Sequence, residues 1–344
     1  MRQVHRLLVT GGAGFIGSNF VHWMLERHPD LRIVVLDKLT YAGNLANLAD
    51  LEGDPRYEFV RGDIADPDAV EAVAARVDAI VNFAAESHVD RSIEAGAEFI
   101  RTDIEGTHVL LEAARRHRHQ LFLQISTDEV YGHVESGSST EEAPLAPRSP
   151  YAASKACADL LVLAHATTYD LPVLITRSSN NYGPYQFPEK VVPLFVTNAL
   201  DGEPLPLYGD GLQVRDWLFV RDNCEAIERV LLEGELGSVY NIGSGDDMTN
   251  LALTRTILAA TGQPETLVRL VADRPGHDRR YAVDAGRIRA LGWTPRHSFA
   301  DGMAQTIEWY RGHEAWWRPL KTGEYLDYYR RQYAGRLAGS RALE

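Results

Sequence analysis

The sequence predicts an α/β fold, with a doubly wound parallel sheet and a smaller α/β substrate-binding unit interleaved at the carboxyl side. Three observations support this expectation. A glycine-rich turn at residues 10–17 directly follows an apolar run at 7–9. Apolar runs of strand length then alternate with helical patterns as far as residue 176. A polar cluster at 126–132 follows the apolar run 121–125, at the sheet edge where open α/β sheets bind their ligands.

Composition limits the class of protein. A chain of 344 residues, 45% hydrophobic and 24% charged, has room for two globular domains. A net charge of -13 argues against a nucleic-acid partner, because proteins that bind the phosphate backbone need excess cations. Two cysteines, Cys157 and Cys224, exclude a disulfide framework and suit a reducing cytoplasm. Neither a signal peptide ahead of residue 7 nor a membrane-spanning run is recognised, so we expect no membrane association.

The turn at 10–17 has glycines spaced for dinucleotide binding. Gly11, Gly14 and Gly17 permit a tight turn, a close approach of the backbone to a pyrophosphate, and contact between helix and strand. The helix that follows contributes free N–H groups and the positive end of its dipole. The preceding strand and following helix make this a Rossmann-type site rather than an isolated glycine motif.

The second predicted strand, residues 32–36, ends in Asp37. A carboxylate there can accept hydrogen bonds from the adenosine ribose and would repel a 2′-phosphate, so NAD is expected rather than NADP, with Lys38 as a mild caution. After a third strand at 57–60, Asp63 and Ile64 could hold an adenine edge; a simple turn carboxylate is nearly as good a reading. The full set of expected cofactor-binding residues is Gly11, Gly14, Phe15, Ile16, Gly17, Asp37, Lys38, Thr40, Asp63, Ile64, Phe83, Ala84, Ala85, Ser87, Thr102, Tyr151, Lys155 and Asn181.

The fourth predicted strand, residues 79–83, runs into small residues that would let the backbone approach a cofactor. Ser87 and His88 should face the same cavity as Asp128. The remaining histidines lack ligand-like spacing, so no metal is expected.

Two adjacent carboxylates, Asp128 and Glu129, follow Thr127 at the end of the strand 121–125. Tyr151 and Lys155 follow one loop later and lie four apart, on one face of a helix. Taken alone, the carboxylates could equally well cap the next turn. Beside a tyrosine and a lysine, they indicate an acid–base site.

The helix expected at 151–168 carries alanine and leucine over more of its surface than one sheet can cover. We expect a homodimer built on this helix and the one at 103–117; burial under the chain's own second domain is a nearly equal alternative.

The strand–helix alternation stops after the sixth strand, at residues 177–184. We therefore expect a cofactor domain at 1–180, to which 214–243 returns, and a nucleotide-sugar domain at 181–344. The strand near 217–220 and the helix after it should rejoin the first sheet. The aromatic carboxyl end is expected to be packing surface rather than a site, and frayed from about residue 335.

The segment 10–17, together with Tyr151 and Lys155, resembles the extended short-chain dehydrogenase/reductase family. Four further segments, 84–92, 126–132, 180–190 and 274–281, are similar more narrowly to the dTDP-glucose 4,6-dehydratases, and this similarity extends over nearly the whole chain. One departure is Asp103, where the family pattern has asparagine after Thr102.

The resemblance implies residue roles. Tyr151 would be the base for the sugar 4-hydroxyl, with its pKa lowered by Lys155, and Thr127 would hydrogen-bond the same hydroxyl. Asp128 would be the acid toward the 6-hydroxyl and Glu129 the base at C5. The expected substrate-binding residues are Ser87, His88, Thr127, Asn180, Glu189, Lys190, Val191, Pro206, Tyr208, Arg215, Asn250, Arg274, His277 and Tyr281.

The expected function is therefore that of a cytoplasmic lyase in deoxysugar biosynthesis that dehydrates a nucleotide-activated hexose, with dTDP-glucose implied by the resemblance. The steps are oxidation at C4, loss of water between C5 and C6, and return of hydride to C6, which regenerates NAD. Two alternatives remain open: a nucleotide-sugar 4-epimerase, and a non-catalytic nucleotide-sensing protein on the same fold.

Overall fold

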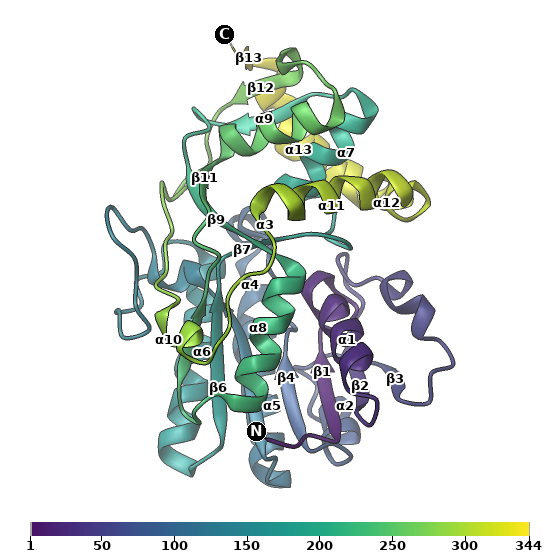
Figure 1. Ribbon diagram of the computed structural model, residues 1–344, viewed down its shortest axis with the longest axis vertical. Helices are drawn as coiled ribbons and strands as arrows, with labels where there is room; N and C mark the ends of the chain where they lie inside the picture. Colours follow the sequence, from purple (N-terminus) through teal and green to yellow (C-terminus); the bar gives the residue numbers. More distant parts are fainter. Residues whose placement is uncertain (1, 344) are drawn as a thin grey trace.

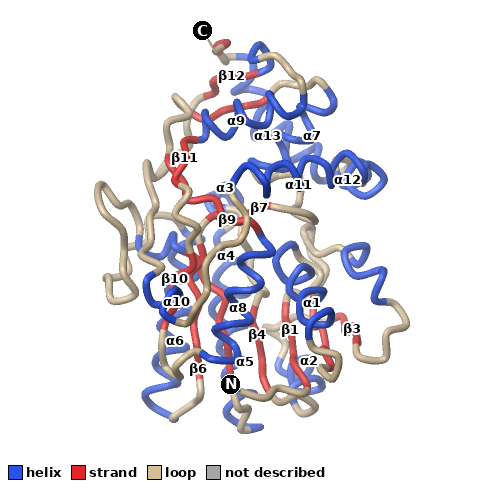
Figure 2. Tube along the Cα trace, viewed as in Figure 1, coloured by secondary structure: helices blue, strands red, loops and turns tan. Residues whose placement is uncertain are grey.

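The computed structural model of the protein describes residues 2–343. Its central feature is a seven-stranded sheet whose neighbouring strands all pair in parallel (Figures 1 and 2). The strand order reverses between β1 and β4, and such a switch point is where open α/β sheets bind cofactors. This topology confirms the predicted fold class. In spatial order the strands are β10 (Val239–Ile242), β6 (Val173–Ser178), β5 (Leu121–Thr127), β4 (Ala79–Asn82), β1 (Arg6–Thr10), β2 (Arg32–Asp37) and β3 (Tyr57–Arg61).

Helices cover both faces of this sheet, which is why its strands are apolar on both sides. Side chains of α1 (Phe15–Arg27) and α8 (Val220–Glu233) share one core cluster with Leu121 and Leu123 of β5. Phe122, the residue between those leucines, packs in a second cluster with helices of the opposite face. Those helices are α2 (Pro67–Ala74), α5 (Thr107–His117) and α6 (Pro150–Tyr169).

The smaller unit contains two three-stranded sheets, and its core is a separate cluster rich in aromatic residues. One sheet joins β7 (Asn180–Tyr182), β9 (Val214–Phe219) and β11 (Asp247–Thr249); the other joins β8 (Leu205–Tyr208), β12 (Val268–Val271) and β13 (Arg341–Ala342). The helices of this unit are α7 (Val191–Asp201), α9 (Asn250–Thr261), α11 (Phe299–Gly312), α12 (Glu314–Leu320) and α13 (Glu324–Ala338).

The chain passes repeatedly between the two cores (Figure 1). It leaves the large sheet after β6, returns with α8 and β10, and leaves again for β11. It returns once more at α10 (Gly286–Ala290), where Ile288 and Trp293 pack into the α1–α8 cluster, before α11 begins. We did not predict this last return. The division of the chain into domains at residue 180 stays a prediction.

Two expectations about the carboxyl half were wrong. β9 pairs with β7 and β11 rather than with the large sheet, so α8 and β10, but not β9, rejoin that sheet. The carboxyl end is ordered as well, because α13 continues to Ala338 and β13 pairs with β12. Its packing explains this order, since Tyr333 is buried in the aromatic core and Leu337 packs against it.

Short helical elements connect β4 to α5. They are α3 (Val89–Glu94), α4 (Gly96–Phe99) and a π-helical segment, Ile100–Gly106. A π-helical segment changes the direction of side chains within a helix and often occurs at functional sites. Here it carries Thr102 and Asp103, both buried.

Candidate functional site

A cavity of about 220 Å³ opens at the carboxyl ends of the central strands. All the expected cofactor-binding residues line it except Asn181. The side-chain amide of Asn181 instead donates to Ser179 O at 2.9 Å. The structure therefore brings together residues from six separate stretches, between positions 11 and 155, as a dinucleotide site requires.

The glycines of the first turn are needed for its shape. Gly11 has a φ of +66°, and a Cβ there would lie 2.6 Å from the backbone nitrogen of Ala84. A Cβ on Gly17 would lie 2.3 Å from Gly11 O. Any other residue at these two positions would push the turn away from the neighbouring loop and from its own helix.

Asp37 supports this turn as well as lining the cavity. Its carboxylate accepts the backbone N–H of Ala13 at 2.9 Å and of Leu39 at 2.8 Å. Lys38 lies 3.1 Å from Asp63, so its charge is compensated and does not invite a 2′-phosphate. Asp63 also accepts the N–H of Ala65 at 3.0 Å, so it closes a turn and lines the cavity at once.

Tyr151 and Lys155 line one end of this cavity, and Thr127 and Asp128 lie close to Tyr151 just outside that lining. Thr127 ends β5 and caps the following turn by accepting the N–H of Glu129 at 3.3 Å, while its hydroxyl donates to Asp128 at 3.2 Å. Lys155 is buried and donates to Ile125 O at 2.7 Å. The carboxylates thus do not cap the turn, and the capping alternative for them is wrong.

Asp128 and Glu129 have different electrostatic surroundings. Burial, followed by the charge of Glu129, raises the pKa of Asp128 to about 8. Burial also raises the pKa of Glu129, but Arg274, Arg215 and Lys190 oppose that shift. Within residues 2–343, Asp128 Oδ2 and Glu129 Oε2 are buried without a hydrogen-bond partner. At neutral pH, Asp128 is therefore a proton donor, whereas three cations favour the ionised form of Glu129.

The pKa of Tyr151 differs from our expectation. Burial, followed by the negative charges of Glu129 and Asp103, raises its pKa well above the ordinary value, where we expected Lys155 to lower it. Burial has the opposite effect on Lys155 and lowers its pKa, because it disfavours the charged, protonated form. The chain's own groups thus keep the phenol protonated more strongly than Lys155 alone predicts.

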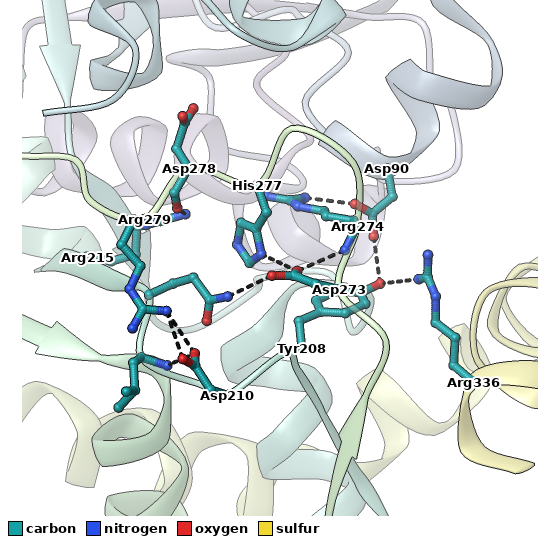
Figure 3. A network of polar contacts seen from close by, with 12 residues as sticks. Asp90, Tyr208, Asp210, Arg215, Asp273, Arg274, His277, Asp278, Arg279 and Arg336 are labelled. Atoms are coloured by element: carbon teal, nitrogen blue, oxygen red, sulfur yellow. Dashed lines mark hydrogen bonds and ion pairs between the residues drawn. The ribbon is translucent and has the colours of Figure 1, made fainter. Parts of the chain in front are cut away.

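A second polar network lies beside this cluster, on the side of the smaller unit (Figure 3). Asp90 is buried and accepts hydrogen bonds from Arg274 at 2.7 Å and from the Tyr208 hydroxyl at 3.0 Å. Gln332 Nε2 adds a third bond at 2.7 Å, and Arg336 donates to Tyr208 at 2.8 Å. Three segments far apart in sequence, β8, the loop after β12 and α13, therefore meet on one carboxylate.

The remaining side chains of this region also converge. His277 contacts Asp273 at 2.6 Å, and burial, then Arg274, lowers the pKa of His277 to about 4, so its ring is neutral. The guanidinium of Arg215 lies 4.3 Å from the ring centroid of Tyr281. Arg274, Arg215 and Lys190 all act on Glu129, which places three cations around one end of the site.

Other predicted substrate residues lie around this network. Lys190 donates to Ser87 O at 2.6 Å, Glu189 pairs with Arg91 at 3.0 Å, and His88 is buried edge-on to the ring of Tyr328. Asn180 begins β7 and Asn250 begins α9; in each, the side-chain oxygen is buried with no partner in the described part of the chain. Val191 begins α7, and Pro206 is buried in β8, two residues before Tyr208.

Sequence reasoning missed several residues of the site. Glu86, Ser126, Gln186 and Phe187 line the cavity, and Asp90, Gln332 and Arg336 organise the second network. A signal existed for Asp90, because this carboxylate closely follows the cavity-lining residues 84–87 after the fourth predicted strand. The last helix gave no such signal for Gln332 and Arg336, which bond to Asp90 and Tyr208. That the carboxyl end is packing surface rather than a site stays a prediction.

The described residues contain neither a metal-binding cluster nor a membrane-spanning helix. Across residues 2–343, His, Cys, Asp and Glu side chains form no group of three or more that could hold a metal ion. Over the same residues, no helix combines the length and the apolar character needed to cross a membrane.

Comparison with known proteins places this geometry in a family. The sequence profile described as GDP-mannose 4,6 dehydratase matches residues 8–306. A dTDP-glucose 4,6-dehydratase of Streptomyces niveus is 55% identical over 322 residues, which cover 92% of this chain and 96% of that protein. One of Streptomyces antibioticus is 56% identical over 321 residues, 92% and 95% of the two chains.

Solved structures agree with the sequence relatives. The dTDP-glucose 4,6-dehydratase DesIV of Streptomyces venezuelae, crystallised with NAD and TYD bound, has a TM-score of 0.90 and 55% identity, and the similarity covers 92% of this chain and all of that one. The UDP-glucose 4-epimerase of Thermus thermophilus, in complex with NAD, has a TM-score of 0.83 at 33% identity, covering 90% and 99%. The chain therefore belongs to the dTDP-glucose 4,6-dehydratases of the extended short-chain dehydrogenase/reductase family.

Proposed function

We propose that the protein is a lyase that converts dTDP-glucose to dTDP-4-keto-6-deoxyglucose and regenerates its NAD in each cycle. Its relatives at about 55% identity carry this activity in their names, and a relative of the same fold was crystallised with NAD and TYD. The observation that carries the proposal is the pair Asp128 and Glu129, whose pKa values are set differently beside Tyr151 and Lys155.

The residues lining the cavity fit NAD. The glycine turn, Asp37 and the Asp63–Ile64 pair accommodate its adenosine half, and Ser87, Tyr151 and Lys155 line the other end. Bound NAD⁺ would accept hydride from the sugar, return it later, and bring a positive charge beside the Tyr151 phenol. That charge opposes the upward shift that burial and Glu129 impose on the pKa of Tyr151.

In the first step, Tyr151 removes the proton of the sugar 4-hydroxyl while C4 loses hydride and becomes a ketone. Thr127 orients that hydroxyl, and Lys155 positions the phenol from one helical turn away. A ketone at C4 acidifies the hydrogen on C5, which prepares the next step.

In the elimination, Glu129 takes the C5 proton, the bond from C6 to its oxygen breaks, and a C5–C6 double bond forms. Asp128, protonated at neutral pH, donates its proton to the departing hydroxyl, which leaves as water. Hydride then adds to C6 and a proton returns to C5. The carboxylate pair has no part in a simple epimerisation, so its electrostatic asymmetry favours the dehydratase.

The second network suits the nucleotide diphosphate. Arg274, Arg215 and Lys190 place positive charge next to the catalytic carboxylates, and Arg274 Nε is buried without a partner among the described residues. A guanidinium N–H left in this way is a ready donor to a phosphate oxygen. We assign Tyr208, His277 and Tyr281 to the walls of the same pocket.

The test is incubation of the protein with dTDP-glucose, followed by mass analysis of the product. Loss of one water with no net change in NAD supports the dehydratase. An unchanged mass with inverted C4 would indicate an epimerase, and binding without conversion a sensing protein.

We also propose a homodimer, built on α5 and α6, that works in a reducing cytoplasm. Leu160 of α6 is 56% exposed and Ile100 60%, so the smaller unit does not cover this surface. Cys157 and Cys224 are free thiols. Sedimentation at micromolar protein should give a dimer that Leu160→Glu weakens, and a monomer for the parent protein would contradict the assembly.

A further inference from the structure

Asp103 is a buried carboxylate next to the catalytic residues, and the proposed mechanism does not use it. It lies in the π-helical segment Ile100–Gly106 and is 1% exposed. Its Oδ1 accepts the backbone N–H of Glu86 at 2.9 Å, and its Oδ2 accepts the hydroxyl of Ser154 at 2.6 Å. Glu86 belongs to the loop that lines the cofactor cavity, and Ser154 precedes Lys155 in α6.

These two bonds connect the cofactor loop to the catalytic helix through a single side chain. An asparagine could make both contacts, because its oxygen can accept from Glu86 and its NH₂ can donate to Ser154. The Ser154 hydroxyl lies 2.8 Å from Tyr151 O, which gives it an acceptor in that case. What the carboxylate adds to this connection is therefore its charge.

The charge of Asp103 acts on both catalytic residues of α6. It raises the pKa of Tyr151, after the larger effects of burial and Glu129, and it opposes the lowering of the Lys155 pKa by burial. Burial raises the pKa of Asp103 itself to about 6, with Lys155 acting in the opposite direction. Asp103 therefore becomes charged near pH 6, within the range in which enzymes work.

The other charged groups near Asp103 either are paired with an opposite charge or act mainly on other residues. Glu86 opposes its ionisation from the cofactor loop, and Glu86 is itself influenced by Lys38, Glu98 and Arg91. Asp159, one turn after Lys155, is paired with Arg177 at 2.8 Å. From the end of β5, Glu129 and Asp128 act on Tyr151.

We infer that Asp103 is a positioning residue whose charge sets the pH range over which Tyr151 takes up the substrate proton. The inference rests on the proposed function, in which Tyr151 is the base. Below about pH 6 Asp103 is neutral and has little electrostatic effect. Above that pH its charge holds the phenol protonated and so restrains the first step.

The test compares Asp103→Asn with Ser154→Ala, both in a Glu129→Gln background in which the first hydride transfer can be followed alone. Removing the charge should lower the Tyr151 pKa and so speed hydride transfer, by up to about tenfold near pH 7.5. Below pH 6 the hydride-transfer rate with Asp103→Asn should approach that of the Glu129→Gln background alone, because Asp103 is neutral there. Ser154→Ala leaves the ionising carboxylate in place and removes a bond that lowers its pKa, so its rate profile should keep the inflection due to Asp103, moved toward higher pH.

A second readout does not depend on activity. Because the folded pKa of Asp103 lies above its unfolded value, its protonated form stabilises the fold at low pH, and this contribution is lost as pH rises through about 6. The melting temperature of the parent minus that of Asp103→Asn should therefore fall between about pH 4 and 6 and then level off.

Rate profiles of Asp103→Asn and Ser154→Ala with the same shape, or a melting difference independent of pH, would overturn the inference. If the parent protein fails to convert dTDP-glucose at all, the proposed function fails instead. The melting experiment would still report whether Asp103 ionises near pH 6.

Discussion

The two polar regions of the site handle buried carboxylates in opposite ways. At the end of β5, Asp128 and Glu129 each have a buried oxygen without a partner in residues 2–343, and burial raises both pKa values. Asp90 is also buried, but Arg274 and Tyr208 donate to it (Figure 3), and so does Gln332. Burial, the largest single effect, would raise the Asp90 pKa, yet the charges of Arg274 and His88 and the hydrogen bonds from Arg274 and Tyr208 together lower it.

This difference separates carboxylates that react from carboxylates that hold structure. A carboxylate that accepts from three donors stays ionised, and most of its lone pairs are already engaged. One that is buried with an unpaired oxygen is ready to exchange a proton. Proximity and burial do not distinguish these two kinds, whereas their partners do.

The largest expected effect concerns the carboxylates at the end of β5. Glu129→Gln should leave the first hydride transfer possible and slow elimination by about 10²–10⁴, the usual contribution of a positioned general base. Stopped-flow absorbance should then show NADH that persists, where the parent shows it only transiently. Asp210→Asn is the matched control, because Asp210 is exposed and paired with Arg279. Parental turnover without NADH build-up would make Glu129 a structural residue.

Tyr151→Phe should give the complementary result, with a loss of similar size at the step before. Without a phenol to take the hydroxyl proton, hydride transfer from C4 should be about 10²–10⁴ slower. Little NADH should therefore form at any time. Rapid-mixing absorbance compares it directly with Glu129→Gln. Phenylalanine has nearly the size of tyrosine, so the packing should be preserved. If Tyr151→Phe accumulated NADH, another group would have to be the base.

The pKa of Asp128 predicts an alkaline limit. Its raised folded pKa means that it is protonated below about pH 8 and loses the proton above it. The elimination rate should fall about tenfold per pH unit beyond that point, while the first hydride transfer does not. Single-turnover product formation between pH 6 and 10 measures the limit. In Asp128→Asn, which is slower throughout, the limit near pH 8 should vanish; if it persists, another group supplies it.

In the network around Asp90 we expect substitutions to weaken substrate binding rather than to slow the chemical steps. Asp90→Ala leaves Arg274 buried without its anion, so the free energy of unfolding should fall by about 3–5 kcal/mol. Asp90→Asn keeps an acceptor and should lose less stability, with KM for dTDP-glucose raised about tenfold and kcat nearly unchanged. Denaturant unfolding and steady-state kinetics give both numbers. A large loss of kcat in Asp90→Asn would remove the contrast between the regions.

The smallest effect should come from the outer edge of that network. Arg336→Ala removes one donor to Tyr208, and KM should rise about two- to tenfold, the scale of one hydrogen bond. Arg330→Ala on the same helix is the control, since Arg330 is exposed and makes only a weak contact with Asp327. Equal KM values for the two variants would mean that α13 only packs.

Most of the fold and of the cofactor site could be predicted from the sequence because the signals are local. The glycine spacing, the carboxylate after β2 and the fully apolar β5 each lie in one short segment, and strand ends at one sheet edge necessarily meet. Family, activity and NAD were likewise predicted, and the relatives confirm them.

What sequence reasoning missed depends on long-range packing. Gln332 reaches Asp90 across 242 positions, and no local pattern announces such a contact. The placement of β9 in the smaller sheet depends on pairing with β7 and β11, which strand propensity cannot specify. The Tyr151 pKa is raised by burial and then by three carboxylates from two other segments, so the Tyr–Lys spacing alone could not predict the direction of its shift.

The repeated crossing of the chain between the two cores constrains how such an enzyme can be recombined. Each core is assembled from three separated stretches, the larger from residues 6–178, 220–242 and 285–293. Transplanting the substrate unit of a relative therefore requires five junctions, after β6, before α8, after β10, before α10 and before α11. A chimera with one junction would divide at least one core, so new sugar specificity is more accessible by changing single side chains than by exchanging modules.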